Sequence, residues 1–253
     1  MKQIGNTILI TGGSSGIGLA LAQKLLSLGN TVIVTGRSEE RLAAVRRSSP
    51  GIHTFVCDQG DFGAVEALAD WLASRFPNLN VLINNAGIGR KINLNDSKSA
   101  VNLDEEIRVN LMGPIHLVQL LLPRLKLLPS SMIVNVTSGL AFVPLPLKPV
   151  YCATKAAMHS YTQSLRVQLR RSCVTVVELA PPATNTNFNK GQEEINVRRL
   201  MDASQVAEQF VQGMQRGSSE ILPGMSKVIR MIGRLAPSAT LRAKEAENMA
   251  GSA

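Results

Sequence analysis

Residues 11–18, with the sequence T-G-G-S-S-G-I-G, lie between a short β-branched run and the start of a helical pattern. Gly12 allows a tight turn, Gly16 allows the backbone to approach a pyrophosphate, and Gly18 allows close packing of helix on strand. The start of such a helix offers free N–H groups to phosphate. The segment predicts a dinucleotide site to which the turn contributes Gly12, Ser14, Ser15, Gly16, Ile17 and Gly18.

Two other interpretations of this turn are open. A nucleoside triphosphatase loop needs Lys followed by Ser or Thr after its last glycine, and Ile17 and Gly18 do not provide them, so triphosphate hydrolysis is disfavoured. The turn could also be a purely structural connection. Its position after a strand and before a helix favours the dinucleotide site.

The rest of the chain alternates short apolar runs with helical stretches. The expected strands are residues 7–11, 31–35, 54–57, 81–84, 132–137, 174–179 and, weakly, 220–222. The expected helices are residues 16–28, 39–47, 62–76, 104–127, 151–171 and 203–216. Strands that are apolar on both faces and separated by helices predict an α/β fold, a doubly wound parallel sheet with helices on both faces.

No stretch rich in Pro, Gly or Ser is long enough to mark a domain boundary, so residues 1–253 are expected to form one domain. Within it, residues 223–253 form a C-terminal amphipathic extension after the last expected strand. Ligands of such sheets bind beyond the carboxyl ends of the strands. The long irregular segments after those ends, residues 88–102, 139–150 and 181–201, are therefore expected to be binding loops.

Composition and charge narrow the classes of partner. The net charge is +9, but the basic residues occur as scattered pairs and only 4% of residues are aromatic, which argues against nucleic acid. Three cysteines without CxxC spacing indicate a reducing compartment, and three widely separated histidines make a metal site improbable. The chain shows no signal peptide and no apolar run that could span a bilayer, so a cytoplasmic location is predicted.

The second expected strand ends in V-T-G-R-S, residues 34–38. A fold that binds NAD commonly places Asp or Glu here, on the ribose 2′-hydroxyl, about 20 residues after the glycine turn. This chain has Arg37 instead, whose guanidinium fits the 2′-phosphate of NADP, and Ser38 could add a hydroxyl. Ser38 is equally suited to cap the helix that begins at Glu39, and the two roles are compatible. The sequence predicts NADP(H) in preference to NAD(H).

A second group of polar residues follows the later strands. Tyr151 and Lys155 of Y-C-A-T-K are four residues apart near a helix start, so their side chains share one face. Ser138 ends the fifth strand, Asn110 lies in R-V-N-L-M-G-P, and N-N-A-G at residues 84–87 ends the fourth strand. YxxxK alone is common by chance, but the whole set is specific.

Pro114 has a consequence for Asn110. Proline has no N–H and its ring displaces the carbonyl four residues earlier, so we expect a kink in which the Asn110 carbonyl is free. That carbonyl could hold a water that links Lys155 to solvent. The kink could also serve packing alone.

Together these motifs resemble the short-chain dehydrogenase/reductase family over residues 6–222. The resemblance implies a Rossmann fold with seven strands and a catalytic set of Asn110, Ser138, Tyr151 and Lys155. It implies cofactor contacts from the glycine turn, from Asp58 at the adenine, from Asn85, Ala86 and Gly87 near the cofactor ribose, and from Tyr151 and Lys155. More narrowly, S-G-L-A-F, P-V-Y-C-A-T-K-A-A and E-L-A-P-P resemble the bacterial oxidoreductases encoded beside lipoteichoic acid D-alanylation genes.

The chain departs from the family pattern after the sixth strand. Family members usually have Pro-Gly there, whereas this chain has Pro181-Pro182. Proline fixes φ where glycine was free, which affects the path of the loop toward Thr184. Pro181, Thr184 and Thr186 are still expected at the cofactor, with Thr186 at the nicotinamide carboxamide.

The expected function is an NADP(H)-dependent oxidoreductase that interconverts a carbonyl and an alcohol by hydride transfer. A free tyrosine titrates near 10, so proton exchange near neutrality is unfavourable by roughly 3 pKa units, or about 4 kcal/mol. The Lys155 ammonium and the oxidised nicotinamide would both stabilise tyrosinate. Tyr151 is then the general acid and base, and Ser138 hydrogen-bonds the oxyanion.

Two other functions stay open at this point. The chain could be a catalytically silent NADP(H)-binding regulatory protein, although the intact Tyr151 and Lys155 argue against it. It could also be an epimerase or dehydratase of the extended branch of the family, which usually needs a larger C-terminal domain than this chain offers.

Three further expectations concern partners. Residues 139–150 carry almost no polar side chains, which predicts a carbonyl or alcohol substrate with an apolar body. The long apolar helices 104–127 and 151–171 predict a homodimer or homotetramer. Residues 225–235 are amphipathic, with apolar Met225, Val228, Ile229, Ile232 and Leu235 opposite Lys227, Arg230 and Arg234. This segment is expected to pack on its own domain or on a partner subunit, and contact with anionic lipid is the alternative.

Overall fold

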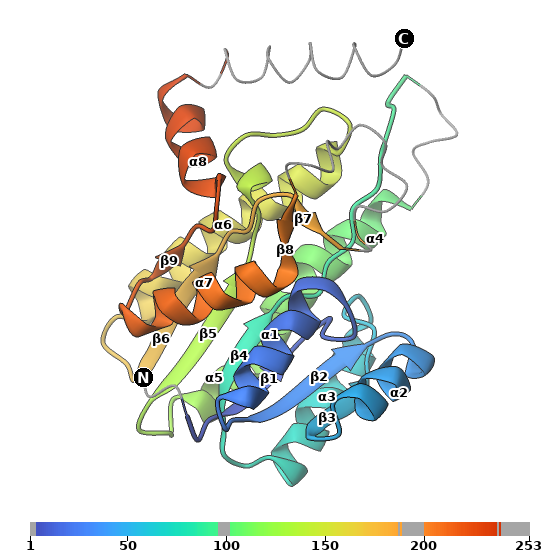
Figure 1. Ribbon diagram of the computed structural model, residues 1–253, viewed down its shortest axis with the longest axis vertical. Helices are drawn as coiled ribbons and strands as arrows, with labels where there is room; N and C mark the ends of the chain where they lie inside the picture. Colours follow the sequence, from blue (N-terminus) through green and yellow to red (C-terminus); the bar gives the residue numbers. More distant parts are fainter. Residues whose placement is uncertain (1–3, 96–101, 187, 189–199, 237, 239–253) are drawn as a thin grey trace.

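The fold is that of a parallel sheet in the order β3-β2-β1-β4-β5-β6-β9, seen in a computed structural model (Figure 1). The structure describes residues 4–95, 102–186, 188, 200–236 and 238. The sheet strands are β1 (Thr7–Ile10), β2 (Thr31–Gly36), β3 (Ile52–Val56), β4 (Leu79–Asn84), β5 (Ser131–Val136), β6 (Val174–Leu179) and β9 (Glu220–Ile221). All their pairings are parallel. The predicted seven-stranded α/β fold is confirmed, including the weakly predicted last strand.

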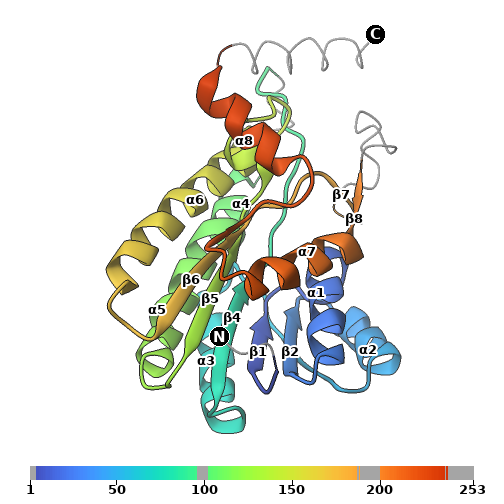
Figure 2. The same ribbon diagram turned by 60° about the vertical axis from the view of Figure 1, so that its left-hand side comes forward.

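Helices cover both faces of this sheet (Figures 1 and 2). One apolar core lies under α1 (Gly16–Ser27), α2 (Glu39–Ser48) and α7 (Ala203–Gln215). A second core lies under α3 (Phe62–Arg75), α5 (Gly113–Leu125) and α6 (Pro149–Leu169). Strands such as β5 are buried along their whole length, because both of their faces contact a helix layer.

The prediction of a single helix over residues 104–127 is wrong in detail. The chain forms α4 (Leu103–Ile107), a π-helical turn η1 (Arg108–Met112) and then α5, which ends at Leu125. Pro114, near the start of α5, has no N–H for the carbonyl of Asn110, so the regular helical bonding is interrupted there. The disturbance of regular helical bonding expected from Pro114 is therefore present, as a π turn. The free Asn110 carbonyl and its water stay predictions.

Two elements were not expected from the sequence. A two-stranded parallel pair joins β7 (Thr184–Asn185) to β8 (Met201–Asp202), and a short 3₁₀ turn η2 (Gly139–Ala141) follows β5. Strands of two residues carry no periodicity, so no pattern could have indicated them. The pair fixes the ends of the segment that was expected to be a binding loop.

Residues 226–235 form the last described helix, α8 (Ser226–Leu235). It lies at the end of the molecule where α6 begins (Figure 2). Ser226 is fully buried, and a Cβ on Gly233 would lie 2.6 Å from Val143 Cγ2, so these positions face the domain. The helix packs on its own domain as expected, but much of its apolar face stays exposed: Met225, Val228, Met231, Ile232 and Leu235. The rest of the predicted extension, residues 237 and 239–253, lies outside the described residues.

Candidate active site

A cleft of ≈ 1240 Å³ runs along the carboxyl ends of the strands and includes the point where β1 lies beside β4. This is where the strand order reverses and where doubly wound sheets bind ligands. Every cofactor-binding residue predicted from the sequence lines the cleft: Gly12, Ser14, Ser15, Gly16, Ile17, Gly18, Arg37, Ser38, Asp58, Asn85, Ala86, Gly87, Tyr151, Lys155, Pro181, Thr184 and Thr186. Ser138 lines it too, whereas Asn110 is buried, with 1% of its surface exposed.

The glycine turn has the geometry that its sequence predicted. Gly12 and Gly16 have φ of 66° and 56°, in the left-handed region that favours glycine. A Cβ on Gly18 would lie 2.5 Å from both the Gly12 carbonyl oxygen and Asn85 Nδ2. Ser15 precedes α1 with extended backbone, and its side chain caps no N–H among the described residues. The first N–H groups of α1 and the close backbone thus fit a dinucleotide pyrophosphate.

Thr11 and Asn85 hold this turn against β4. No role for Thr11 was predicted from the sequence. Thr11 Oγ1 accepts from the backbone N–H groups of Asn85 and Ala86, both at 3.0 Å. Asn85 Nδ2 donates to the carbonyls of Thr11 and Gly12, at 2.9 and 3.1 Å. Thr11 is fully buried. A polar residue ending a buried strand, just before the glycines, was the signal available in the sequence.

Arg37 lies at the far end of the cleft, with 55% of its side chain exposed. Its Nη1 is 3.0 Å from Glu105 Oε1 and 3.9 Å from Asp58 Oδ2. As the sequence shows, no carboxylate stands at the end of β2 before Glu39. Two carboxylates from other elements stand beside Arg37.

Ser38 and Asp58 have local structural roles in addition to lining the cleft. Ser38 Oγ accepts from the Arg41 N–H at 3.2 Å and so caps α2, which confirms that interpretation of Ser38. Asp58 Oδ1 accepts from the Gly60 N–H at 2.9 Å and fixes the turn after β3. Contact of Asp58 with adenine stays a prediction.

Tyr151 and Lys155 lie one turn apart on α6, and Ser138 follows β5 opposite them. The side chain of Ser138 lies near enough to Tyr151 to lower its pKa. Lys155 Nζ donates to the Val136 carbonyl at 2.9 Å and lies 5.7 Å from the centroid of the Tyr151 ring. The structure thus brings three of the four expected catalytic residues into one wall of the cleft.

Burial dominates the acid–base properties of this group. It raises the pKa of Tyr151 well above 10, and the nearby Ser138 side chain offsets this only in part. Burial also lowers the pKa of Lys155 to about 8. The surroundings of Tyr151 within the chain therefore favour its protonated form.

Asn110 uses its side chain to hold the segment after β4. Its Oδ1 accepts from the Ile88 N–H at 2.8 Å, and its Nδ2 donates to the Ile88 carbonyl at 2.8 Å. Nδ2 also donates to Thr154 Oγ1 at 3.1 Å, which ties the segment to α6. Asn110 acts on the cleft through these partners, as a positioning residue.

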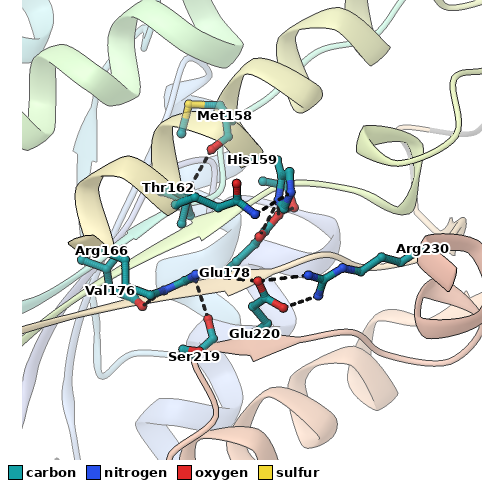
Figure 3. A network of polar contacts seen from close by, with 12 residues as sticks. Met158, His159, Thr162, Arg166, Val176, Glu178, Ser219, Glu220 and Arg230 are labelled. Carbon is teal, nitrogen blue, oxygen red and sulfur yellow. Dashed lines mark hydrogen bonds and ion pairs between the residues drawn. The ribbon is translucent and has the colours of Figure 1, made fainter. Parts of the chain in front are cut away.

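A polar network surrounds Glu178 of β6 (Figure 3), and Glu178 also contacts Thr137, the residue before Ser138. Thr137 Oγ1 donates to Glu178 Oε1 at 2.6 Å, and His159 Nδ1 lies 2.8 Å from Glu178 Oε2. Beside this network, Glu220 of β9 forms an ion pair with Arg230 of α8, which connects the C-terminal helix to the sheet. The backbone that positions Ser138 is therefore braced by a charged residue that is 1% exposed, Glu178.

The remaining wall of the cleft is mainly apolar and comes from separate segments: Leu140, Val143, Leu145, Leu147, Phe188, Leu200, Ile229 and Ile232. Lys91 and Lys148 also line the cleft, and Lys148 Nζ lies 5.9 Å from the Tyr151 ring centroid and 4.8 Å from that of Phe188. The sequence placed one lysine in a segment expected to be apolar, and the fold directs it into the cleft.

The segment after β6 follows the cleft despite Pro182. The Pro181 carbonyl accepts from the Gly139 N–H at 2.9 Å, and Thr184 Oγ1 donates to the Pro182 carbonyl at 2.9 Å. A Cβ on Gly16 would lie 3.2 Å from Thr186 Cγ2, so Thr186 reaches the glycine turn. Contact of Thr186 with a carboxamide stays a prediction.

Metal and membrane features were searched over the part of the chain that the structure describes. No cluster of three or more His, Cys, Asp or Glu side chains that could hold a metal ion occurs in it. Cys57, Cys152 and Cys173 are all free thiols. None of the described helices combines the length and the apolar character needed to cross a bilayer.

Comparison with known proteins agrees with this site. Residues 6–196 match the short chain dehydrogenase family. The chain therefore belongs to the short-chain dehydrogenase/reductase family and is an oxidoreductase. Within that family it is similar to the uncharacterized oxidoreductase DltE of Bacillus subtilis (strain 168), with 47% identity over 87% of this chain and 89% of that protein.

Two solved structures share the fold and carry nicotinamide cofactors. A short-chain dehydrogenase/reductase from Burkholderia phymatum in complex with NAD has a TM-score of 0.80 and 25% identity, over 91% of this chain and 93% of that chain. A short-chain dehydrogenase from Burkholderia cenocepacia J2315 in complex with NADP has a TM-score of 0.83 and 25% identity, over 95% and 99% of the two chains. A nicotinamide cofactor is thus supported for the cleft, without a choice between the two.

Proposed function

We propose that the protein is an NADP(H)-dependent dehydrogenase/reductase that interconverts a carbonyl and an alcohol. The observation that carries the proposal is the placement of Tyr151, Ser138 and Lys155 in the wall of the cleft that the glycine turn also lines. When bound, the nicotinamide supplies or accepts the hydride. The residues of the chain bind and orient both reactants and move the proton.

Each residue has a distinct task in this mechanism. Tyr151, which is protonated before the reaction, donates its hydroxyl proton to the carbonyl oxygen during reduction. Ser138, which lines the same cleft as Tyr151, is placed to donate to the same oxygen as negative charge develops on it. Lys155, held at the Val136 carbonyl, is placed to hold the nicotinamide ribose and to attract negative charge on Tyr151.

The preference for NADP(H) rests on Arg37, with Ser38 beside it. A charge-assisted hydrogen bond contributes about 1.5–3 kcal/mol, so an unopposed Arg37 would give roughly a ten- to hundred-fold preference. Asp58 and Glu105 oppose it in part, so we expect a preference nearer the lower value. Fluorescence titration of NADPH and NADH tests this point. Tighter NADH, or equal affinities that Arg37→Gln leaves unchanged, would contradict the proposal.

A panel of carbonyl compounds tests the reaction and the substrate class. We expect aldehydes or ketones with an apolar body to be reduced with NADPH, because apolar side chains form most of the substrate wall. Each neutral compound should be paired with its carboxylate analogue, since Lys148 lies beside Tyr151. NADPH binding without any turnover would favour the regulatory alternative instead. Good turnover of sugars alone would contradict the apolar body.

Assembly and location are further parts of the proposal. Ile107, Met112 and Val167 are exposed apolar residues in or beside the helices α4, α5 and α6, so we propose a homodimer or homotetramer through this region. A monomer in sedimentation at micromolar concentration would contradict it. We place the protein in the cytoplasm because its three cysteines are free thiols. Vesicle co-sedimentation tests lipid contact by α8.

A further inference from the structure

Glu105 lies beside Arg37 at the cofactor end of the cleft, and neither the sequence motifs nor the family match assigns it a role. It lies on α4, and Val109 about one helical turn later lines the cleft. Glu105 Oε1 accepts from Arg37 Nη1 at 3.0 Å across 68 residues of sequence. Arg37 is the residue that we expect to contact the 2′-phosphate. A long-range ion pair therefore occupies part of the guanidinium that this phosphate needs.

The Arg37 guanidinium faces two carboxylates, because Asp58 Oδ2 lies 3.9 Å from the same Nη1. The 2′-phosphate would add up to two further negative charges. Asp58 also bonds the Gly60 N–H and fixes a turn, whereas both oxygens of Glu105 contact arginines. Glu105 is thus the carboxylate whose main partners are the charges at this end of the cleft.

Arg90 gives Glu105 an alternative partner. Its Nη2 pairs with Glu105 Oε2, and its Nη1 donates to the Asn102 carbonyl at 3.2 Å. Glu106 Oε1 accepts from the Arg90 backbone N–H at 2.7 Å, so Arg90 is held at both its backbone and its side chain. The two arginines also lower the pKa of Glu105, and Arg90 has the larger effect. Glu105 can therefore lose Arg37 and remain an ion-paired carboxylate.

We propose that Glu105 is a specificity-determining residue that competes with the 2′-phosphate of NADP(H) for Arg37, and that Arg90 reduces this competition by sharing the carboxylate. The proposal rests on the proposed contact of Arg37 with that phosphate. The negative charge of Glu105 opposes the binding of NADP(H) and leaves the binding of NAD(H) unaffected, so it reduces the preference for NADP(H). NADH has no 2′-phosphate and leaves the Arg37–Glu105 pair intact.

Direct titration of NADPH and NADH by fluorescence, with the full chain, tests the proposal. We expect Glu105→Gln to tighten NADPH about threefold to tenfold and to change NADH by less than twofold. Arg90→Gln should have the opposite sign and weaken NADPH about twofold to fivefold, because Glu105 then has Arg37 as its main partner. Raised salt should reduce both effects.

Asp104→Asn is the matched control, since it removes the same charge from the neighbouring position of α4, where Asp104 pairs with Arg108. A gain for Asp104→Asn as large as that for Glu105→Gln would overturn the proposal by showing a general charge effect. Unchanged or weaker NADPH binding in Glu105→Gln, with Arg37→Gln still weakening NADPH, would overturn it and leave the proposed function intact. If Arg37→Gln leaves NADPH binding unchanged, the 2′-phosphate contact itself fails, and the inference with it.

Discussion

The two ends of the cleft are built by different means. At the cofactor end, one continuous turn presents backbone N–H groups, and close contacts at Gly12 and Gly18 fix its shape. At the substrate end, the wall is made of side chains from segments that are far apart in the sequence, among them Lys148 and Ile229. A backbone site allows almost no change in shape, whereas a side-chain wall can change one residue at a time. We therefore expect mutations to affect either cofactor affinity or substrate turnover, according to the end they touch.

Tyr151→Phe should separate the two ends with the largest effect. Loss of the general acid should lower kcat by roughly 10²–10⁴-fold, while the dissociation constant for NADPH stays nearly unchanged. Steady-state kinetics and fluorescence titration measure the two quantities. Tyr161→Phe is the control, because it removes the other tyrosine hydroxyl of α6. Full activity of Tyr151→Phe would exclude the proposed mechanism.

Gly18→Ala should damage the cofactor end. Its Cβ would lie 2.5 Å from the Gly12 carbonyl and from Asn85 Nδ2, so the turn must open. We expect NADPH to bind more than about tenfold weaker and the free energy of unfolding to fall by roughly 1–3 kcal/mol. Gly63→Ala in α3 is the control, since only Asp61 Oδ1, at 3.4 Å, lies near its Cβ. Wild-type affinity in Gly18→Ala would show that the turn is not fixed by packing.

Lys155→Met should stabilise the folded protein, and the size of this stabilisation should depend on pH. Burial lowers the pKa of Lys155 to about 8 from 10.5, so the unfolded chain binds this proton more tightly than the folded one. The folded state is therefore penalised below about pH 8, and the penalty fades as the pH rises from 8 toward 10.5. We expect Lys155→Met to raise the free energy of unfolding by roughly 1–3 kcal/mol at pH 7. The loss of the hydrogen bond to the Val136 carbonyl offsets part of the stabilisation.

Urea unfolding at pH 7 and at pH 10 measures this difference. The gain in stability should be smaller at pH 10, because Lys155 of the folded protein is already neutral there and part of the lysine in the unfolded chain has lost its proton too. Lys126→Met, at an exposed position, should show no such change. If Lys155→Met raised the free energy of unfolding equally at both pH values, the cause would be packing and not the charge of Lys155.

Gly233→Ala should have the smallest effect of these substitutions, and it should change substrate binding alone. A Cβ there would lie 2.6 Å from Val143 Cγ2 and 2.7 Å from the Phe142 carbonyl, which moves α8 away from the wall. We expect KM to rise about threefold to tenfold, or roughly 1 kcal/mol, without a change in NADPH affinity. Arg234→Ala, at the neighbouring exposed position, is the control. A matching loss of cofactor affinity would contradict the independence of the two ends.

The sequence predicted the parts of the molecule that depend on neighbours along the chain. The strands and helices follow from apolar periodicity, and β6 has the predicted bounds. The glycine turn and the pair Tyr151 and Lys155 are local motifs, so their geometry could be inferred. The match with the short chain dehydrogenase family confirms the resemblance drawn from these motifs.

The other features of the site depend on contacts between residues that are far apart in the sequence, and such contacts leave no local pattern. Glu105 meets Arg37 across 68 residues, and Thr11 meets Asn85 across 74. The direction of Lys148 depends on the path of residues 139–150, which have no periodic pattern. The π turn at Asn110 was foreseen only as a kink, because proline shows where regular bonding fails but not how the helix recovers.

That turn makes the length of this helical segment as important as its composition. A π turn carries one more residue than an α-helical turn, and each residue of an α-helix rotates the chain by about 100°. Deleting a single residue between Arg108 and Met112 would remove the extra residue of the π turn and rotate α4 relative to α5. Glu105 would then leave Arg37 although no residue at either end of the pair had changed. In alignments with relatives, a one-residue gap here would therefore signal a different cofactor end.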